Sequence, residues 1–168
     1  LLCLTVHETC HGLAAYALGD PTARDRHRLS LNPLRHIDWL GFAMMLFAGF
    51  GWAKPVPVDP RYFKKPKRGM ALTALAGPVS NLLLAFLAML FCHKLLADWI
   101  VSDTCPAYWL YLFLHLWAAP LSIGLGLFNL LPIPPLDGAK VLGAFLPDRT
   151  YFGLMRYERY GMLLLLAL

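Results

Sequence analysis

Two histidines and a glutamate stand close together near the start of the chain, in the H-E-x-x-H pentad His7-Glu8-Thr9-Cys10-His11. Residues four apart in a helix lie on one face, about one turn from each other. Both imidazoles can therefore bind a single Zn²⁺, and the glutamate between them lies beside the metal as a general base. The pattern predicts hydrolysis by a metal-activated water, with His7 and His11 as ligands and Glu8 as the base.

The pentad lies inside an apolar stretch, residues 1–18. Hydrophobic residues make up 58% of the 168 residues and charged residues only 15%, whereas a soluble domain has about 45–50% and about 25%. The composition predicts a membrane protein. An ionisable cluster at membrane depth is costly, so it indicates a functional site.

A zinc protease site needs three protein ligands and an open position for water. A metzincin would place the third histidine at position 17, which is Ala17 here. Asp137 is the candidate, because it directly follows a proline-rich break. His11 lies 8 residues before Gly19 and Asp137 lies 10 before Pro147, so both are about 12–15 Å from the same end of the membrane. The alternative is that Asp137 caps the helix that follows it.

The apolar pattern predicts an all-α polytopic membrane protein, a bundle of transmembrane helices. We expect helices over residues 1–18, 70–96 and 108–146, the last interrupted by its prolines because it is nearly twice a normal span of about 20 residues. The apolar run of residues 39–52 is only fourteen residues long and is rich in glycine, so it is too short for a span of about 20 residues. We expect it to be re-entrant or interfacial, or to form a β-hairpin with residues 53–58. Residues 98–105 read as an outer loop.

The basic residues are strongly biased along the chain. Ten of the fifteen Lys and Arg fall between Gly19 and Gly69, and the only one between Met70 and Ala139 is Lys94. This is the positive-inside pattern, so the net charge of +5 indicates cytoplasmic loops and no nucleic-acid partner. A specific contact with anionic lipid or with a substrate is the alternative. We expect a multi-pass protein of the cell membrane with its active site nearer the cytoplasmic side.

Three motifs carry a resemblance to the site-2 protease family of intramembrane zinc metalloproteases, peptidase family M50: His7-Glu-Thr-Cys-His11, Ala76-Gly-Pro-Val-Ser-Asn81 and Asn129-Leu-Leu-Pro-Ile-Pro-Pro-Leu-Asp-Gly138. Residues 31–38 and 51–58 are similar to its small prokaryotic branch. The resemblance implies a zinc metalloendopeptidase with one Zn²⁺ per chain. It assigns the metal to His7, His11 and Asp137 and the general base to Glu8. Ala139 departs from the family's usual glycine, which leaves the ligand set intact.

The tetrahedral intermediate of such a reaction needs hydrogen-bond donors for its oxyanion. Asn129 and Asn81 are amides on two different helices near the predicted site, and either is a candidate donor. The alternative is that they form interhelical hydrogen bonds. The implied partners are the lipid bilayer and a transmembrane protein substrate. The sequence does not indicate whether the protein is a monomer or an oligomer.

Both ends of the chain look cut, and residues 161–168 only begin another span. We expect residues 1–168 to be a single transmembrane protease core domain of a longer protein. Two other functions compete with proteolysis. A metal transporter usually has internal repeats with paired broken helices, and here the pentad and the proline break are unlike each other. A catalytically silent scaffold has no need of the glutamate between its ligands.

Overall fold

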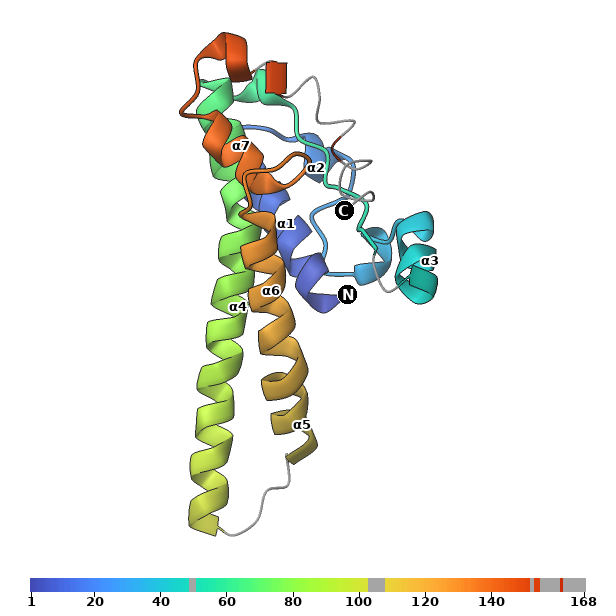
Figure 1. The fold of residues 1–168 in the computed structure, drawn as a ribbon, viewed down its shortest axis with the longest axis vertical. Helices are drawn as coiled ribbons and strands as arrows, with labels where there is room; N and C mark the ends of the chain where they lie inside the picture. Colours follow the sequence, from blue (N-terminus) through green and yellow to red (C-terminus); the bar gives the residue numbers. More distant parts are fainter. Residues whose placement is uncertain (49–50, 103–107, 152, 155–160, 162–168) are drawn as a thin grey trace.

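Two long helices running side by side form the body of the molecule, in a computed structural model that describes residues 1–48, 51–102, 108–151, 153–154 and 161 (Figure 1). The first is α4, Pro66–Ser102. The second runs without interruption through three segments: α5, Tyr108–Phe113, the π-helical η3, Leu114–Ala118, and α6, Ala119–Asn129. Residues Pro66–Ala97 and Tyr108–Asn129 are each long and apolar enough to cross a membrane. The prediction of a helical membrane protein is confirmed to this extent, while the span expected to begin at residue 161 lies outside the described residues.

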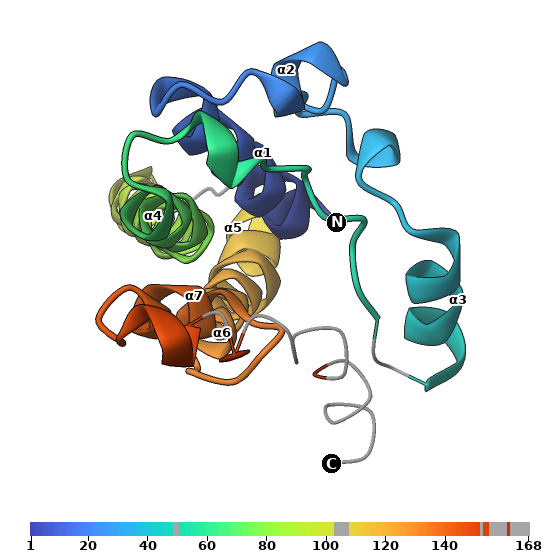
Figure 2. The same cartoon turned by 90° about the horizontal axis from the view of Figure 1, so that it is seen from above.

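The remaining elements are shorter and lie beside the half of the long pair that contains the start of α4 (Figure 1). Helix α3 stands to the side of the others (Figure 2). They are α1 (Leu2–Ala17), α2 (Thr22–Asp25), the 3-10 turns η1 (Pro33–Arg35) and η2 (Pro60–Tyr62), α3 (Trp39–Ala48) and α7 (Asp137–Gly143). Helix α1 packs against α4 and α6, and α7 packs against the first turns of α4.

Small side chains fill the contact between the helices, and large apolar ones face outward. Helix α4 has a row of buried residues with a spacing of four: Gly69, Thr73, Gly77, Asn81 and Ala85. Ala74, Pro78 and Cys92 on the same helix are buried as well. Its two phenylalanines and several of its leucines are exposed, as Leu83 and Phe86 show with 55% and 59% of their surface accessible. Rows of residues four apart form the ridges by which helices pack, and small residues let helices approach closely in a membrane. The large side chains are left on the outer surface of the helix pair.

Residues 39–48 form a helix, so the β-hairpin form of the expected element is not confirmed. Asp38 explains the helix, because its side chain accepts a hydrogen bond from Gly41 N–H at 2.9 Å in the manner of an N-cap, and the alanine, methionine and leucine residues that follow favour helix. The chain returns close beside α3, where a Cβ on Gly41 would collide with the Trp52 carbonyl. The described residues have no strand, and Ile37 and Ala53 form an isolated antiparallel bridge.

The predictions for the two ends of the long pair had different outcomes. Residues 98–102 belong to α4, so this part of the expected outer loop was wrong; residues 103–107 lie outside the described part of the chain. The break at the other end is confirmed: α6 ends at Asn129, and α7 begins at Asp137 after an irregular, proline-rich turn. Gly138 lies so close to the Leu130 carbonyl that a Cβ would collide with it, which requires glycine at this position.

Residues 51–59, here called the 51–59 segment, return from α3 along α1. Lys54 anchors the segment through its backbone: its N–H donates to the His36 carbonyl at 2.9 Å, and its carbonyl accepts from Arg28 Nη2 at 2.7 Å. At the other end, Asp59 N–H donates to the fully buried Asp20 carboxylate at 2.7 Å. The Arg61 guanidinium hydrogen-bonds the Asp59 side chain and lowers its pKa to about 2.

Candidate metal centre

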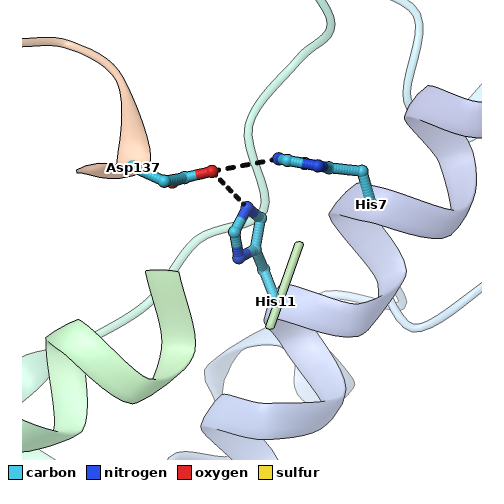
Figure 3. Close-up of side chains that lie close together, drawn as sticks. All are labelled: His7, His11 and Asp137. Carbon is cyan, nitrogen blue, oxygen red and sulfur yellow. Dashed lines mark hydrogen bonds and ion pairs between the residues drawn. The ribbon is translucent and has the colours of Figure 1, made fainter. Parts of the chain in front are cut away.

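Helix α1 presents two imidazole rings on one face. His7 and His11 are buried, with 3% and 9% of their surface accessible. Their ring centroids are 4.5 Å apart and the rings are nearly perpendicular. The Nε2 atoms of both rings point toward the same carboxylate, which comes from α7 (Figure 3). The four-residue spacing in the sequence therefore produces the shared face that it predicts.

That carboxylate belongs to Asp137, which is 130 residues from His7 in the chain. Its Oδ2 lies 3.0 Å from His7 Nε2 and 3.1 Å from His11 Nε2. Asp137 is the first residue of α7, the N-cap is Leu136, and no side chain caps this helix end. The carboxylate therefore contacts the two histidines and does not serve the capping role that we considered as an alternative.

The proton on His11 shows why this cluster suits a cation. His11 Nδ1 lies 2.7 Å from the Thr73 carbonyl, and a carbonyl can only accept, so a proton sits on Nδ1. Nε2 then faces the carboxylate with a lone pair unless the ring carries a second proton. Two acceptors 3.1 Å apart need a positive charge between them, and the separation is close to the roughly 3.3 Å between ligands of a tetrahedral zinc with bonds of about 2.0–2.1 Å.

One atom from each of the three side chains lies within 4.8 Å of the others. Two imidazoles and one carboxylate make up a ligand set of catalytic zinc sites, which keep a fourth position for water. Ionisable side chains buried among apolar helices also require a partner. The residues present therefore fit a zinc ion.

A cavity of about 540 Å³ opens beside this cluster, and Glu8 lines it together with the three candidate ligands. Glu8 Oε2 accepts a hydrogen bond from Val56 N–H at 2.9 Å. Val56 lies between Pro55 and Pro57, and proline has no N–H, so this stretch offers Glu8 a single backbone donor. The pentad glutamate is thus held at the cavity by the 51–59 segment.

The two asparagines predicted as oxyanion donors occupy different places. Asn129 lines the cavity, and its amide nitrogen donates to the Leu125 carbonyl of its own helix at 2.9 Å. Asn81 is fully buried behind His7, with its amide nitrogen 3.0 Å from His7 Nδ1. Of the two, only Asn129 is among the residues that line this cavity.

Sequence reasoning missed two parts of this site on α4. The Thr73 carbonyl orients His11, and Gly77 lies directly against both rings: a Cβ there would be 2.5 Å from His11 Nε2 and 2.7 Å from His7 Cε1. The signal that could have found them is the spacing of four from Thr73 through Gly77 to Asn81, which matches the spacing of the histidines. Nothing in the residue types marks the role of a backbone carbonyl.

Comparison with known proteins places this arrangement in a family. The profile of "Peptidase family M50" matches residues 100–167. "Putative zinc metalloprotease YwhC" of Bacillus subtilis is 40% identical over 168 residues, covering 100% of this chain and 76% of that protein. "Putative zinc metalloprotease Rip2" of Mycobacterium tuberculosis is 33% identical over 174 residues, covering 100% of this chain and 63% of its own length.

The chain therefore belongs to peptidase family M50, and its predicted class, a metalloendopeptidase of the site-2 protease family, is confirmed. A third protein, "Putative zinc metalloprotease MJ0611" of Methanocaldococcus jannaschii, is 33% identical over 105 residues, 61% of this chain and 49% of that protein. The comparison with solved structures gives no significant match.

Proposed function

We propose that the chain is an intramembrane zinc endopeptidase that cuts peptide bonds in or near the transmembrane segments of membrane proteins. The observation that carries this proposal is the meeting of His7, His11 and Asp137, with one ligand atom from each within 4.8 Å. They lie beside Glu8 at a cavity between helices of membrane-spanning length. The relatives named as zinc metalloproteases support the same metal. The single such cluster found among the described residues supports one Zn²⁺ per chain.

In this proposal the three ligands would hold zinc, which, when bound, supplies a Lewis acid and lowers the pKa of a bound water to about 7. Glu8 is the general base. Its Oε2 is engaged by Val56 N–H, so Oε1 is the atom that takes the proton of the water and later passes it to the leaving amine. Asn129 is the better placed of the two predicted oxyanion donors, because it lines the cavity.

The walls of the cavity favour an apolar substrate segment. Leu125 and Phe128 of α6 and Leu136 before α7 contribute to them. Peptide bonds must be presented in an extended form to be cut, and the 51–59 segment at the same cavity could pair with such a strand. Helix α4 begins at the same end of the molecule as α7 (Figure 1), and its residues Met70 and Thr73 line the cavity. Basic residues stand next to this start in the sequence: Lys64, Lys65, Lys67 and Arg68. They support a site on the cytoplasmic side of the membrane.

Two variants test the proposal in vesicles. Glu8→Gln removes the base but no ligand, so we expect zinc content to stay at the wild-type level while cleavage falls by roughly 10²–10⁴-fold. Asp137→Ala removes a ligand, so we expect both zinc and cleavage to be lost. The purified chain is reconstituted with a membrane-protein fraction, zinc is measured by metal analysis, and cleavage is counted as new protein N-termini by mass spectrometry.

The same pair separates the competing functions. A metal transporter or a silent scaffold would give no new N-termini with the wild-type chain, and Glu8→Gln would then change nothing. Wild-type levels of cleavage by Glu8→Gln, in vesicles free of other proteases, would refute the mechanism. Wild-type zinc content in Asp137→Ala would show that the third ligand lies elsewhere.

A further inference from the structure

One face of α4 matches the metal-binding face of α1 turn by turn. The Thr73 carbonyl lies 2.7 Å from His11 Nδ1, and the amide nitrogen of Asn81 lies 3.0 Å from His7 Nδ1. Gly77, halfway between them, leaves room for both rings. Each imidazole thus turns Nε2 to Asp137 and Nδ1 to α4. The hydrogen-bond partner of Nδ1 decides whether Nδ1 or Nε2 carries the ring proton.

The Thr73 carbonyl and the Asn81 amide differ in the histidine tautomers that they allow. A carbonyl only accepts, so His11 keeps a proton on Nδ1, and Nε2 is the ring nitrogen that binds a metal once any second proton has left it. An asparagine amide can present either its NH₂ group or its oxygen. In the structure the NH₂ group of Asn81 faces His7 Nδ1, which makes Nδ1 the acceptor. The proton of His7 is then on Nε2, shared with Asp137 Oδ2 at 3.0 Å, and an Nε2 that carries a proton cannot be a metal ligand.

The other end of the same amide is unpaired. Asn81 is fully buried, and among the described residues its Oδ1 has no hydrogen-bond partner. A half-turn of the amide would bring Oδ1 to His7 Nδ1, where it could accept a proton. In either orientation only one of the two amide atoms, Nδ2 or Oδ1, contacts His7 Nδ1. The orientation that the amide adopts therefore depends on which nitrogen of His7 carries the proton. The backbone at this turn is held in place, because Ser122 Oγ donates to the Asn81 carbonyl at 3.0 Å.

We propose that Asn81 is a positioning residue whose amide reverses when the metal binds. It donates to His7 Nδ1 when the site is free of metal, and it accepts from His7 Nδ1–H when Nε2 coordinates a divalent cation. The Thr73 carbonyl holds a proton on His11 Nδ1 whether or not metal is bound, whereas Asn81 makes His7 the ligand that must change its tautomer. This inference rests on the proposed zinc site and adds a role for Asn81 that is separate from oxyanion binding.

The test measures metal binding and the histidine tautomer, and it does not depend on cleavage. Asn81→Leu has nearly the same volume and cannot hydrogen-bond, and loss of a hydrogen-bond partner of a metal-binding histidine typically costs 10–100-fold in metal affinity. We expect that loss in its zinc dissociation constant, measured by competition with a chromogenic chelator in the full chain in detergent. Asn81→Asp can only accept from Nδ1–H, and we expect it to bind zinc within threefold of wild type.

The wild-type chain provides the second readout. In protein with ¹⁵N-labelled histidine at mildly alkaline pH, we expect the His7 proton to move from Nε2 to Nδ1 when zinc is added, and to lie on Nδ1 before zinc is added in Asn81→Asp. A wild-type His7 that already carries its proton on Nδ1 without metal would overturn the inference. So would equal zinc affinities of Asn81→Leu and wild type. A chain that binds zinc in this way but makes no new N-termini would refute the proposed function and leave this inference standing.

Discussion

Gly77 is the position where a single methyl group would test the architecture of the metal centre most directly. It lies on α4 between the two partners of the histidine rings. A Cβ at this position would be 2.5 Å from both Cε1 and Nε2 of His11 and 2.7 Å from Cε1 of His7. Its backbone does not need glycine, because the described glycine with positive φ is Gly19. Gly77→Ala therefore changes the site without straining the helix.

The size of the effect follows from these distances. Ordinary contacts begin at 3.4 Å, so the His11 ring must retreat by about 0.9 Å, whereas metal–ligand distances tolerate about 0.2 Å. The atom that must move is the predicted ligand atom itself. We expect zinc affinity to fall by at least about 100-fold, equivalent to about 2.8 kcal/mol. Alanine is favoured over glycine in a helix by roughly 0.5–1 kcal/mol, which offsets part of the roughly 1–3 kcal/mol that overpacking against the rings costs the metal-free chain.

The assay is a zinc dissociation constant from chelator competition, together with thermal unfolding of the metal-free chain. Gly124→Ala is the matched control, because it also lies in a membrane helix and a Cβ there meets nothing within 4 Å. We expect it to bind zinc as wild type does. Gly77→Ala with a zinc affinity within threefold of wild type would refute the close packing of α4 against the rings that this reasoning requires.

Two further predictions concern the 51–59 segment. Val56→Pro removes the N–H that donates a hydrogen bond to Glu8 at 2.9 Å. We expect cleavage to fall by about tenfold, the effect of losing roughly 1.4 kcal/mol, while zinc content stays unchanged. Val56→Ala keeps the N–H and should cleave normally, and equal activity of the two variants would contradict the role of this contact. Asp20→Ala removes the buried acceptor of Asp59 N–H, and hydrogen bonds to charged groups contribute about 1.5–3 kcal/mol. We expect a lower unfolding temperature and faster proteolysis within the segment, and an unchanged digestion rate would show that Asp20 does not anchor it.

Part of this site could be predicted from the sequence because it depends on local geometry. The spacing of His7 and His11 places both on one face of any helix, whatever surrounds it. The position of Asp137 could be predicted through depth, because the rise of a helix converts residue counts into distance from the membrane surface. The break between α6 and α7 followed from its prolines and from a stretch too long for one span.

Other features depend on contacts that residue types do not encode. Val56 N–H and the Thr73 carbonyl belong to the backbone, so the residue types at these positions do not indicate that they hydrogen-bond Glu8 and His11. Residues 39–48 were open to a hairpin because a short, glycine-containing apolar run suits either structure. The Asp38 side chain caps this segment as a helix, and Gly41 lets the returning chain pass beside it.

The chain by itself therefore determined the chemistry that is available: which side chains can bind a metal and on which helix faces they lie. Only the tertiary structure decided how those side chains are held. The close approach of α4 to α1 brings a carbonyl to one ring, an amide to the other and a glycine between them. The physical reason is that helix periodicity is a property of neighbouring residues, whereas the orientation of an imidazole is set by atoms that are distant in sequence and often belong to the backbone.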